Sequence, residues 1–378
     1  MKPRGAIATS YFVLLGLLGA MGPYLTKEFE SRDLEYFSLF LSMPALVGLF
    51  VTPIWGMMAD LFPNIRLWMG LATVLVIGGV MGLINVQGPA IYACMFLYAL
   101  GRAPLSPLLD AITLEIVQKD YGSLRLWGSI GFTVIMVICS LLDENLGLSS
   151  LYIALALGGF LLLLVFQLPI PQRVQSENIF SQLPVVLQNR ELVCLLLASA
   201  LHFSSHAANT SYLAMYIESL NASTLWTGAA ITGGIVVEVL VLAYSSKLLV
   251  RYSPHFLFMV AAFIAFFRWI LMYFALSGWW VFLCQLSHGL TFGLFWIAVV
   301  SWIERISPAE LKNTGQSLLG ASVGGVGVAL GIFLATRVVE SSGLRDIYVL
   351  NIFFGFLTLL ALGYTWRLSS RNEQQHSL

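Results

Sequence analysis

The stretch from Arg102 to Phe132, RAPLSPLLDAITLEIVQKDYGSLRLWGSIGF, places ionisable residues inside and between two otherwise apolar segments. Arg102 and Asp110 both lie within the first of these segments. At the centre of a membrane helix an Arg or Asp costs about 2.5–3.5 kcal/mol on insertion scales, so such residues face a protein interior or a water-filled path. The stretch therefore indicates a polar route for a solute or a proton through a membrane protein.

The amino-acid composition is that of an integral membrane protein. Hydrophobic residues make up 58% of the chain and charged residues only 10%, with a mean hydropathy of +0.86, whereas about a quarter of the residues in soluble domains are charged. The formal net charge is +0, so no nucleic-acid partner is expected. The four cysteines lie in apolar runs without paired spacing, which argues against a disulfide framework and against a zinc site.

Apolar runs recur along the whole chain, and each is long enough for a membrane helix, which needs about 20 residues. The predicted spans are 7–25, 37–59, 67–85, 90–114, 124–142, 149–168, 191–217, 225–246, 256–276, 279–303, 315–339 and 346–366. The first run is long and is followed by similar runs, so we expect it to stay in the mature protein rather than to act as a signal peptide. The pattern predicts an all-α integral membrane protein with twelve transmembrane helices.

The loops between these spans predict the orientation and a division into two halves. Most of the 19 Lys and Arg residues fall in loops that share a side with the two termini, so the positive-inside rule places both termini in the cytoplasm. On that side the longest connection, 169–190, separates an N-terminal bundle, 1–168, from a C-terminal bundle with a short cytoplasmic tail, 191–378. A weak repeat between 56–67 and 245–256 supports two parallel six-helix halves.

Several motifs resemble those of the major facilitator superfamily. Gly56, Ala59 and Asp60 match the core of its signature after the second helix, G-x-x-x-D-R-x-G-R, from which Leu61 and Pro63 depart. A closer likeness is to the branch that contains phenylpropionate permease, the nucleoside–proton symporters and, more distantly, lactose permease. The residues that carry it are Asp110-Ala111, Tyr121-Gly122-x-x-Arg125-Leu126-Trp127-Gly128-Ser129, Glu238, Arg268-Trp269, Gln285-x-x-His288 and Asn313-Thr314-Gly315-Gln316-Ser317.

This resemblance implies a major facilitator fold, in which two six-helix bundles rock around a midplane site, and hence a transporter and not an enzyme. It favours proton-coupled symport, with uptake of a small organic solute such as a sugar, a nucleoside or an aromatic acid. Export of an amphipathic compound is the alternative, suggested by the 13% of aromatic residues. We expect no cofactor and no metal, a proton as the coupling ion, and a monomer that spans a bacterial cytoplasmic (inner) membrane many times.

In the N-terminal half, Asp110 and Arg125 are the leading candidates for substrate binding. The cost of an intramembrane carboxylate favours a functional role for Asp110, and by resemblance Arg125 projects toward the same cavity. Snorkelling to the lipid interface is the alternative for Arg125. Arg102 is a further candidate, although two helical turns separate it from Asp110 and make a direct pair unlikely in an ideal helix. Trp127 either stacks on a substrate ring or packs within the protein.

The seventh predicted span is unusually polar. His202, His206, Asn209 and Tyr216 fall within about 80° of one another on a helical wheel and so form one stripe. Interhelical hydrogen bonds, worth about 0.6 kcal/mol each, suffice to explain one such residue, but four aligned residues favour the wall of a wet cavity. We assign His202, His206 and Asn209 to substrate binding. Ser205 lies on a different face from His206, so the two do not form a nucleophile and base.

Three later spans each contain a titratable residue, namely Glu238, Arg268 and His288, and Gln285 lies one turn before the histidine. By resemblance these four residues belong to a proton-coupling network, in which the proton on Glu238 depends on whether Arg268 is close. A static ion pair between Glu238 and Arg268 is the alternative. A further carboxylate of that network is replaced here by Thr291.

Two further predictions concern the helix ends and helix packing. Asp60 and Arg66, which remain from the partial signature, are predicted gating residues. Four glycines of the eleventh predicted span have small-x-x-x-small spacings, which favour close helix packing. They are Gly320, Gly324, Gly327 and Gly331.

Overall fold

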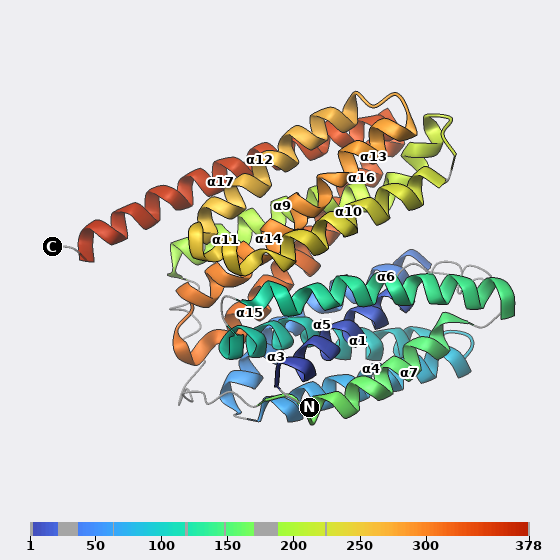
Figure 1. The fold of residues 1–378 in the computed structure, drawn as a ribbon. Helices are drawn as coiled ribbons and strands as arrows, with labels where there is room; N and C mark the ends of the chain where they lie inside the picture. The colour runs from blue at the N-terminus through green and yellow to red at the C-terminus, as the bar shows by residue number, and fades with distance from the viewer. Residues whose placement is uncertain are drawn as a thin grey trace. The chain divides into compact units, whose positions relative to one another are not determined.

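A computed structural model describes residues 3–21, 37–62, 64–117, 120–146, 149–169, 188–223 and 225–376, and the regular elements in these ranges are helices. The first six are α1 (Pro3–Met21), α3 (Phe37–Leu61), α4 (Ile65–Asn85), α5 (Ala90–Val117), α6 (Tyr121–Leu146) and α7 (Ser150–Val165). The later ones are α9 (Arg190–Ser219), α10 (Leu225–Ala243), α11 (Ser245–Arg251), α12 (Pro254–Tyr273), α13 (Gly278–Leu286), α14 (His288–Ile306), α15 (Lys312–Gly320), α16 (Val328–Ser342) and α17 (Ile347–His376) (Figure 1).

These helices confirm the predicted all-α membrane fold. Ten helical stretches of the described chain are long and apolar enough to cross a membrane, and α7 is a shorter apolar helix of 16 residues. α5 has 28 residues and carries the charged residues Arg102, Asp110 and Glu115. When α13 is counted with α14 and α15 with α16, and the short α11 is set aside, the helices of the described chain correspond to the twelve predicted spans.

Two predicted spans are interrupted in the structure. Between α13 and α14, the hydroxyl group of Ser287 donates a hydrogen bond to the carbonyl oxygen of Cys284 (2.6 Å), and such bonds compete with the helical ladder. Between α15 and α16, residues Ala321–Gly327 form a π-helix whose three glycines ease the wider turn. Pro104 and Pro107, in contrast, lie inside an uninterrupted α5.

The described chain groups into two compact units, Met1–Glu177 with Ala309–Ala321, and Asn178–Pro308 with Ser322–Leu378. The boundary within the eleventh span falls in the π-helix. Most of the predicted linker, 170–187, lies outside the described residues, so the predicted division of the halves stays a prediction. Several loop residues that predict the orientation also lie outside the described residues, among them Lys27, Arg32, Lys119 and Arg173.

Close helix contacts hold the first unit together. α1 packs against α6 and α7, α4 packs against α5 and α7, and α5 also packs against α3 and α15. Where α1 and α6 meet, Gly131 lies so close to the backbone of Phe12 that a Cβ atom at this position would collide with the Phe12 carbonyl oxygen. A small residue is therefore required at this crossing.

In the second unit, α17 packs against α9 and α12, α14 packs against α10 and α12, and α16 packs against α9 (Figure 1). Gly327 and Gly331 face α9, where a Cβ atom on Gly331 would collide with the carbonyl oxygen of Ser204. Gly320 packs in the first unit, where an added Cβ atom would lie 2.7 Å from Pro107. The packing prediction is thus confirmed for these three glycines, but it is wrong for Gly324, around which a Cβ atom would meet nothing within 4 Å.

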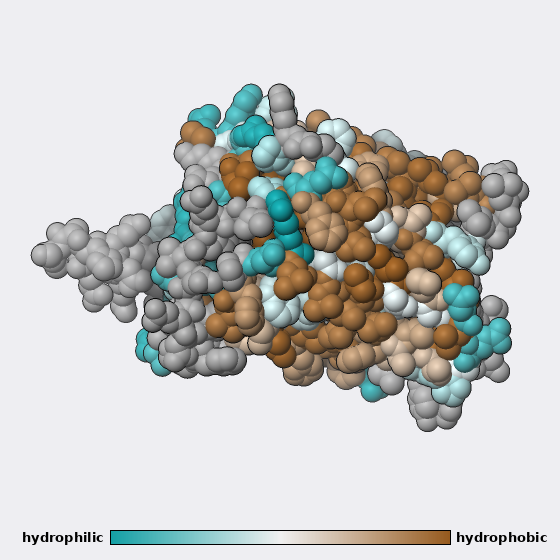
Figure 2. Space-filling view, turned by 90° about the horizontal axis from the view of Figure 1, so that it is seen from below, coloured by the Kyte–Doolittle hydropathy of each residue, from teal (hydrophilic) through white to brown (hydrophobic). Residues whose placement is uncertain are grey.

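Large apolar side chains cover the outside of many helices. Phe50, Leu163 and Phe333, for example, are each at least 60% exposed. Figure 2 shows hydrophobic residues over much of the coloured surface, with smaller hydrophilic patches at its ends and near its middle. In water such a surface would be unstable, but it suits contact with the hydrocarbon interior of a bilayer.

Candidate functional site

In the first unit, Asp110 is the centre of a buried polar cluster. Its carboxyl group on α5 accepts hydrogen bonds at Oδ1 from the hydroxyl groups of Tyr11 on α1 (2.6 Å) and Tyr121 on α6 (2.9 Å). All three side chains are buried, and the two tyrosine rings meet edge to face, with centroids 6.5 Å apart. The hydroxyl groups satisfy the carboxyl oxygen without neutralising its charge. Sequence reasoning missed both tyrosines as site residues, although Tyr121 lies in the motif.

Arg125 faces this cluster. The central carbon of its guanidinium group lies 5.7 Å from the centroid of the Tyr11 ring, in cation–π contact. The charge of Arg125 also interacts with the carboxyl group of Asp110. The structure therefore brings Arg125 toward Asp110, as the resemblance implied, and the snorkelling alternative does not describe this geometry.

Arg102 and Trp127 occupy different positions. The described hydrogen bonds of Asp110 come from the two tyrosines, so Arg102, half-buried two turns earlier on α5, is not a direct partner. Trp127 is 45% exposed, and its place two residues after Arg125 puts it on another face of α6. The substrate-binding prediction for these two residues gains no geometric support from the Asp110 cluster.

In the second unit, Arg268 of α12 is the centre of another buried polar cluster. It is 2% exposed, and its guanidinium group donates hydrogen bonds to the side-chain oxygen atoms of Gln285 and of Thr291 (3.2 Å). One of its Nη atoms also lies 3.5 Å from Nδ1 of His288, at the outer limit of a hydrogen bond. The same group covers the indole ring of Trp269, 4.4 Å from its centroid. Arg268, Gln285 and His288 are thus brought together, as predicted.

Histidines from α9 and α14 continue this cluster. His202 and His206 have ring centroids 4.8 Å apart, and His206 and His288 have centroids 5.5 Å apart. His202 is anchored, since its Nε2 lies 3.2 Å from the carbonyl oxygen of Thr291. Both ring nitrogens of the buried His206 lack a hydrogen-bond partner within the described chain. The predicted stripe therefore does face other helices, and His206 is its member with unused hydrogen-bonding capacity.

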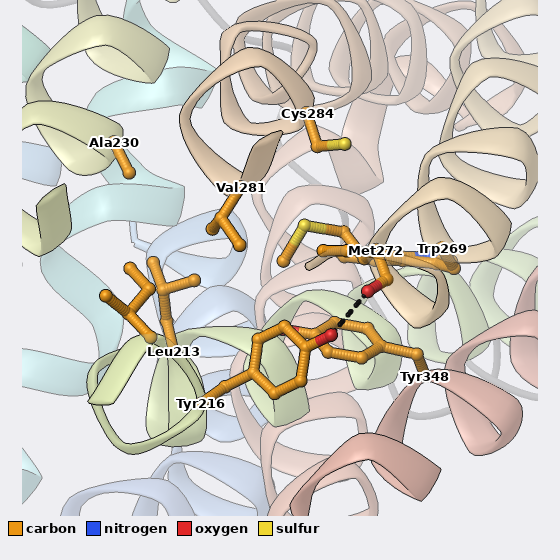
Figure 3. Packing of buried hydrophobic residues seen from close by; sticks show 10 residues of the cluster. Leu213, Tyr216, Ala230, Trp269, Met272, Val281, Cys284 and Tyr348 are labelled. Carbon is orange, nitrogen blue, oxygen red and sulfur yellow. Dashed lines mark hydrogen bonds between the residues drawn. The ribbon is translucent and has the colours of Figure 1, made fainter. Parts of the chain in front are cut away.

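An aromatic layer borders the cluster on the side of α17. The rings of Trp269 and Tyr348 stack with centroids 6.3 Å apart, and Tyr216 meets Tyr348 edge to face (Figure 3). The hydroxyl group of Tyr348 donates to Asn209 (3.3 Å), and that of Tyr216 donates to the carbonyl oxygen of Met272 (2.7 Å). Tyr348 thus contacts the predicted stripe at Asn209. Sequence reasoning missed Tyr348 because 139 residues separate it from this partner.

Asn351 is a second residue that sequence reasoning missed. It is fully buried on α17, one turn from Tyr348, and both of its side-chain polar atoms lack a partner in the part of the chain described. A Cβ atom on Gly355 would lie 3.3 Å from Phe266 of α12, which fixes the register of the two helices. Since the two spans run in opposite directions, Asn351 lies about level with Trp269 and Ile270.

Glu238 lies apart from Arg268 in this conformation. It is buried on α10, where it packs against α14 at Gly289 and Gly293. The described hydrogen bonds of Arg268 go to Gln285, Thr291 and His288, so no hydrogen bond or ion pair between described residues joins it to Glu238. The predicted close pair of Glu238 and Arg268, whether static or proton-dependent, is not formed here.

The predicted gating residue Asp60 binds the start of α15 within the first unit. Its Oδ1 accepts hydrogen bonds from the backbone and the side-chain nitrogen of Asn313 (3.0 and 2.6 Å), and its Oδ2 accepts from the backbone nitrogen and the hydroxyl group of Thr314 (2.6 Å each). Gly56 makes this approach possible, because a Cβ atom there would lie 2.8 Å from the Asn313 carbonyl oxygen. A carboxylate also complements the positive end of a helix.

Arg66, the second predicted gating residue, binds elsewhere. Its Nε donates to the carbonyl oxygen of Leu168, just after α7 (2.7 Å). This bond ties the start of α4 to the end of α7. It gives Arg66 a structural contact of its own, separate from the four bonds of Asp60.

Comparison with known sequences agrees with this architecture. A model of the MFS_1 like family matches residues 6–350. The uncharacterized transporter YwbF of Bacillus subtilis is 24% identical, over 99% of this chain and 96% of its own length. A maltose permease of Geobacillus stearothermophilus is 23% identical, over 96% of this chain and 94% of its own. The probable 3-phenylpropionic acid transporter of Escherichia coli is 29% identical over 59% of this chain and 61% of its own.

Solved structures show the same fold at low sequence identity. The human organic anion transporter MFSD10 has a TM-score of 0.80 at 15% identity, covering 96% of this chain and 100% of its own. The Escherichia coli fucose:proton symporter FucP has a TM-score of 0.79 at 15% identity, covering 97% of this chain and 98% of its own.

Proposed function

Because the chain belongs to the MFS_1 like family of major facilitator transporters, we propose that it takes up a small organic solute together with a proton, by alternating access of one central site. The protein is a multi-pass membrane transporter and not an enzyme. Its relatives include a maltose permease and a probable 3-phenylpropionic acid transporter, which supports sugars and aromatic acids as solute classes, beside nucleosides.

The buried carboxyl group of Asp110 is the observation that carries the proton-coupled part of this proposal. A carboxylate inside a membrane span is costly and titratable, so its presence indicates a function. When it is ionised, it accepts hydrogen bonds from Tyr11 and Tyr121 and attracts Arg125. A bound proton removes the charge and weakens all three interactions. Protonation would therefore loosen the contacts of α5 with α1 and α6.

In the second unit we propose that coupling runs through α14 and not through a direct ion pair. Arg268 contacts Gln285 and His288, which lie on either side of the break between α13 and α14. Glu238 packs against Gly289 on the first turn of α14. A change at Arg268 can thus move the start of α14 and alter the surroundings of the Glu238 carboxyl group.

We place the protein, as a monomer, in a bacterial cytoplasmic membrane with both termini in the cytoplasm. Three bacterial relatives and the excess of basic residues on the side of the termini support this placement. Asp60 is the proposed gate on that side, because it holds the end of α3 to the start of α15.

The test is proton-coupled uptake by the full chain in proteoliposomes. Labelled maltose, uridine and 3-phenylpropionate are supplied outside, with and without an inward proton gradient, and a trapped pH-sensitive dye records proton entry. We expect one solute to accumulate above its external concentration only with the gradient, and to carry protons inward. Asp110→Asn should abolish accumulation while leaving exchange of internal for external solute, because exchange requires no net proton movement.

Solute accumulation that is indifferent to the proton gradient would overturn the symport proposal. Accumulation only under an outward-directed gradient in vesicles of the opposite orientation would instead support export of an amphipathic compound. Arg337→Gln is the control variant, because Arg337 is an exposed residue in the last turns of α16, and its described contacts are with the exposed residues Glu340 and Phe333 of the same helix.

A further inference from the structure

We propose that Arg268 binds the carboxylate of an anionic, ring-containing substrate, and that the neighbouring rings of His206, Trp269 and Phe292 bind the apolar part of that substrate. This inference rests on the proposed transport function and narrows its three solute classes to one, the aromatic acids.

The charge of Arg268 is not balanced within the described chain. Arg268 is 2% exposed in the interior of a membrane span, and its described contacts are with the neutral side chains of Gln285, Thr291, His288 and Trp269. Within the described chain no carboxylate forms an ion pair with it. A buried charge without a partner of opposite sign is strongly destabilising. An anion at Arg268 would remove that imbalance, whereas a neutral sugar or nucleoside would not.

The same side chain also has unused hydrogen-bonding capacity. A guanidinium group has five N–H donors, and a carboxylate binds best to two neighbouring ones at once. The described hydrogen bonds of Arg268 leave from its two Nη atoms, and its buried Nε–H has no partner among the described residues. The edge formed by Nε and one Nη can therefore receive a carboxylate while Gln285 and Thr291 stay bound.

Other buried polar atoms around Arg268 also lack partners. They are Nε1 of Trp269 and both ring nitrogens of His206, each without a hydrogen-bond partner in the described ranges. Buried polar groups are normally satisfied, so orphan donors beside a cation without an ion-pair partner favour a ligand at this place. The indole N–H of Trp269 and one ring nitrogen of a neutral His206 can donate hydrogen bonds, as a carboxylate ligand requires.

The edge of the cluster suggests how a ligand reaches it. His288 and Phe292 are only partly buried, and their rings stack with centroids 5.2 Å apart over the fully buried pair Arg268 and His206. The contact of His288 with Arg268 is long, at 3.5 Å. A charge-assisted bidentate pair is stronger than such a contact. A carboxylate at the Nε edge of Arg268 would thus prevail over the contact of Nη1 with His288, and Phe292, stacked on His288, would border the substrate ring.

Equilibrium binding to the purified full chain tests this proposal without requiring transport. The probes are 3-phenylpropionate, its neutral isostere 3-phenylpropionamide, and maltose, each measured by thermal shift and by tryptophan fluorescence. We expect the acid to bind about 10- to 100-fold more tightly than the amide, as a hydrogen-bonded charge pair implies. Arg268→Gln should remove that preference, Trp269→Phe should weaken binding of the acid less, and Arg337→Gln should change neither.

Equal binding of acid and amide by the unaltered protein would overturn the proposal, whether or not the Arg268→Gln variant folds. A preference for the acid that survives in Arg268→Gln would overturn it too. These outcomes differ from failure of the proposed function. Binding of the acid without gradient-driven uptake would remove proton coupling alone, whereas proton-coupled uptake of maltose without acid binding would remove this inference alone.

Discussion

Replacing Asp60 with Asn should weaken the attachment of the start of α15 to α3 at little steric cost. The two side chains have nearly the same shape, so the change creates no cavity. Asn keeps one oxygen atom, which can still accept the hydrogen bonds from Asn313. Its amino group, however, would face the N–H group of Thr314, where Oδ2 of Asp60 now accepts a bond of 2.6 Å.

The expected loss follows from these contacts. Hydrogen bonds to a charged group contribute about 1.5–3 kcal/mol each, and a buried donor left unsatisfied costs about 1–3 kcal/mol. The hydroxyl group of Thr314 can turn to accept from the new amino group, so mainly the backbone bond is lost. We therefore expect Asp60→Asn to reduce the free energy of unfolding by about 2–3 kcal/mol, a factor of roughly 30 to 150 in the equilibrium constant.

Equilibrium unfolding of the purified protein in mixed detergent micelles measures this loss. Asp120→Asn provides the matched control, because Asp120 pairs with Arg4 at an exposed site, where side-chain exposure is 39% and 63%, and such pairs contribute only about 0–1 kcal/mol. Adding Thr314→Val to the unaltered protein and to Asp60→Asn completes a double-mutant cycle. In this cycle the coupling free energy between residues 60 and 314 should be about 1 kcal/mol. An Asp60→Asn variant as stable as Asp120→Asn would refute the assignment of Asp60 as the partner of α15.

Further predictions use the same measurements. Gly331→Ala should lower the thermal midpoint by several degrees, because the added Cβ atom would collide with the backbone of Ser204. Gly324→Ala should leave the midpoint unchanged or raise it, because nothing lies within 4 Å of its Cβ position, and equal midpoints for the two variants would contradict the packing described. Tyr11→Phe should cost about 1 kcal/mol in unfolding free energy, because Asp110 loses one of its two donors, and should slow gradient-driven uptake more than exchange. An unchanged ratio of uptake to exchange would dissociate the Asp110 cluster from the proton.

The candidate sites were only partly predictable. Sequence reasoning named Asp110, Arg125, Arg268, Gln285 and His288, because polar residues in apolar runs are conspicuous and costly. For Glu238 it left open whether Arg268 lies close, either in a proton-dependent contact or in a static ion pair. In the structure Arg268 points instead to Gln285 and Thr291, because the neighbour of a side chain depends on how helices are rotated and not on which helix carries it.

Both clusters contain partners that no pattern in the sequence predicts. Tyr11 lies 99 residues before Asp110, and Tyr348 lies 139 residues after Asn209. A tyrosine in an apolar span is unremarkable, so neither partner can be found without the packing of the helices. The same holds for Asp60, whose partner Thr314 is 254 residues away.

The sequence by itself determined the number and the approximate positions of the membrane helices, because a chain in lipid must satisfy its backbone hydrogen bonds within each span and needs about 20 apolar residues to cross the membrane. Both requirements are local. The tertiary structure alone decided which partner each buried charge contacts and where the eleventh span widens into a π-helix. It also decided that, among the described residues, no carboxylate forms an ion pair with Arg268. Those features depend on helix contacts between distant segments, and hydropathy carries no information about them.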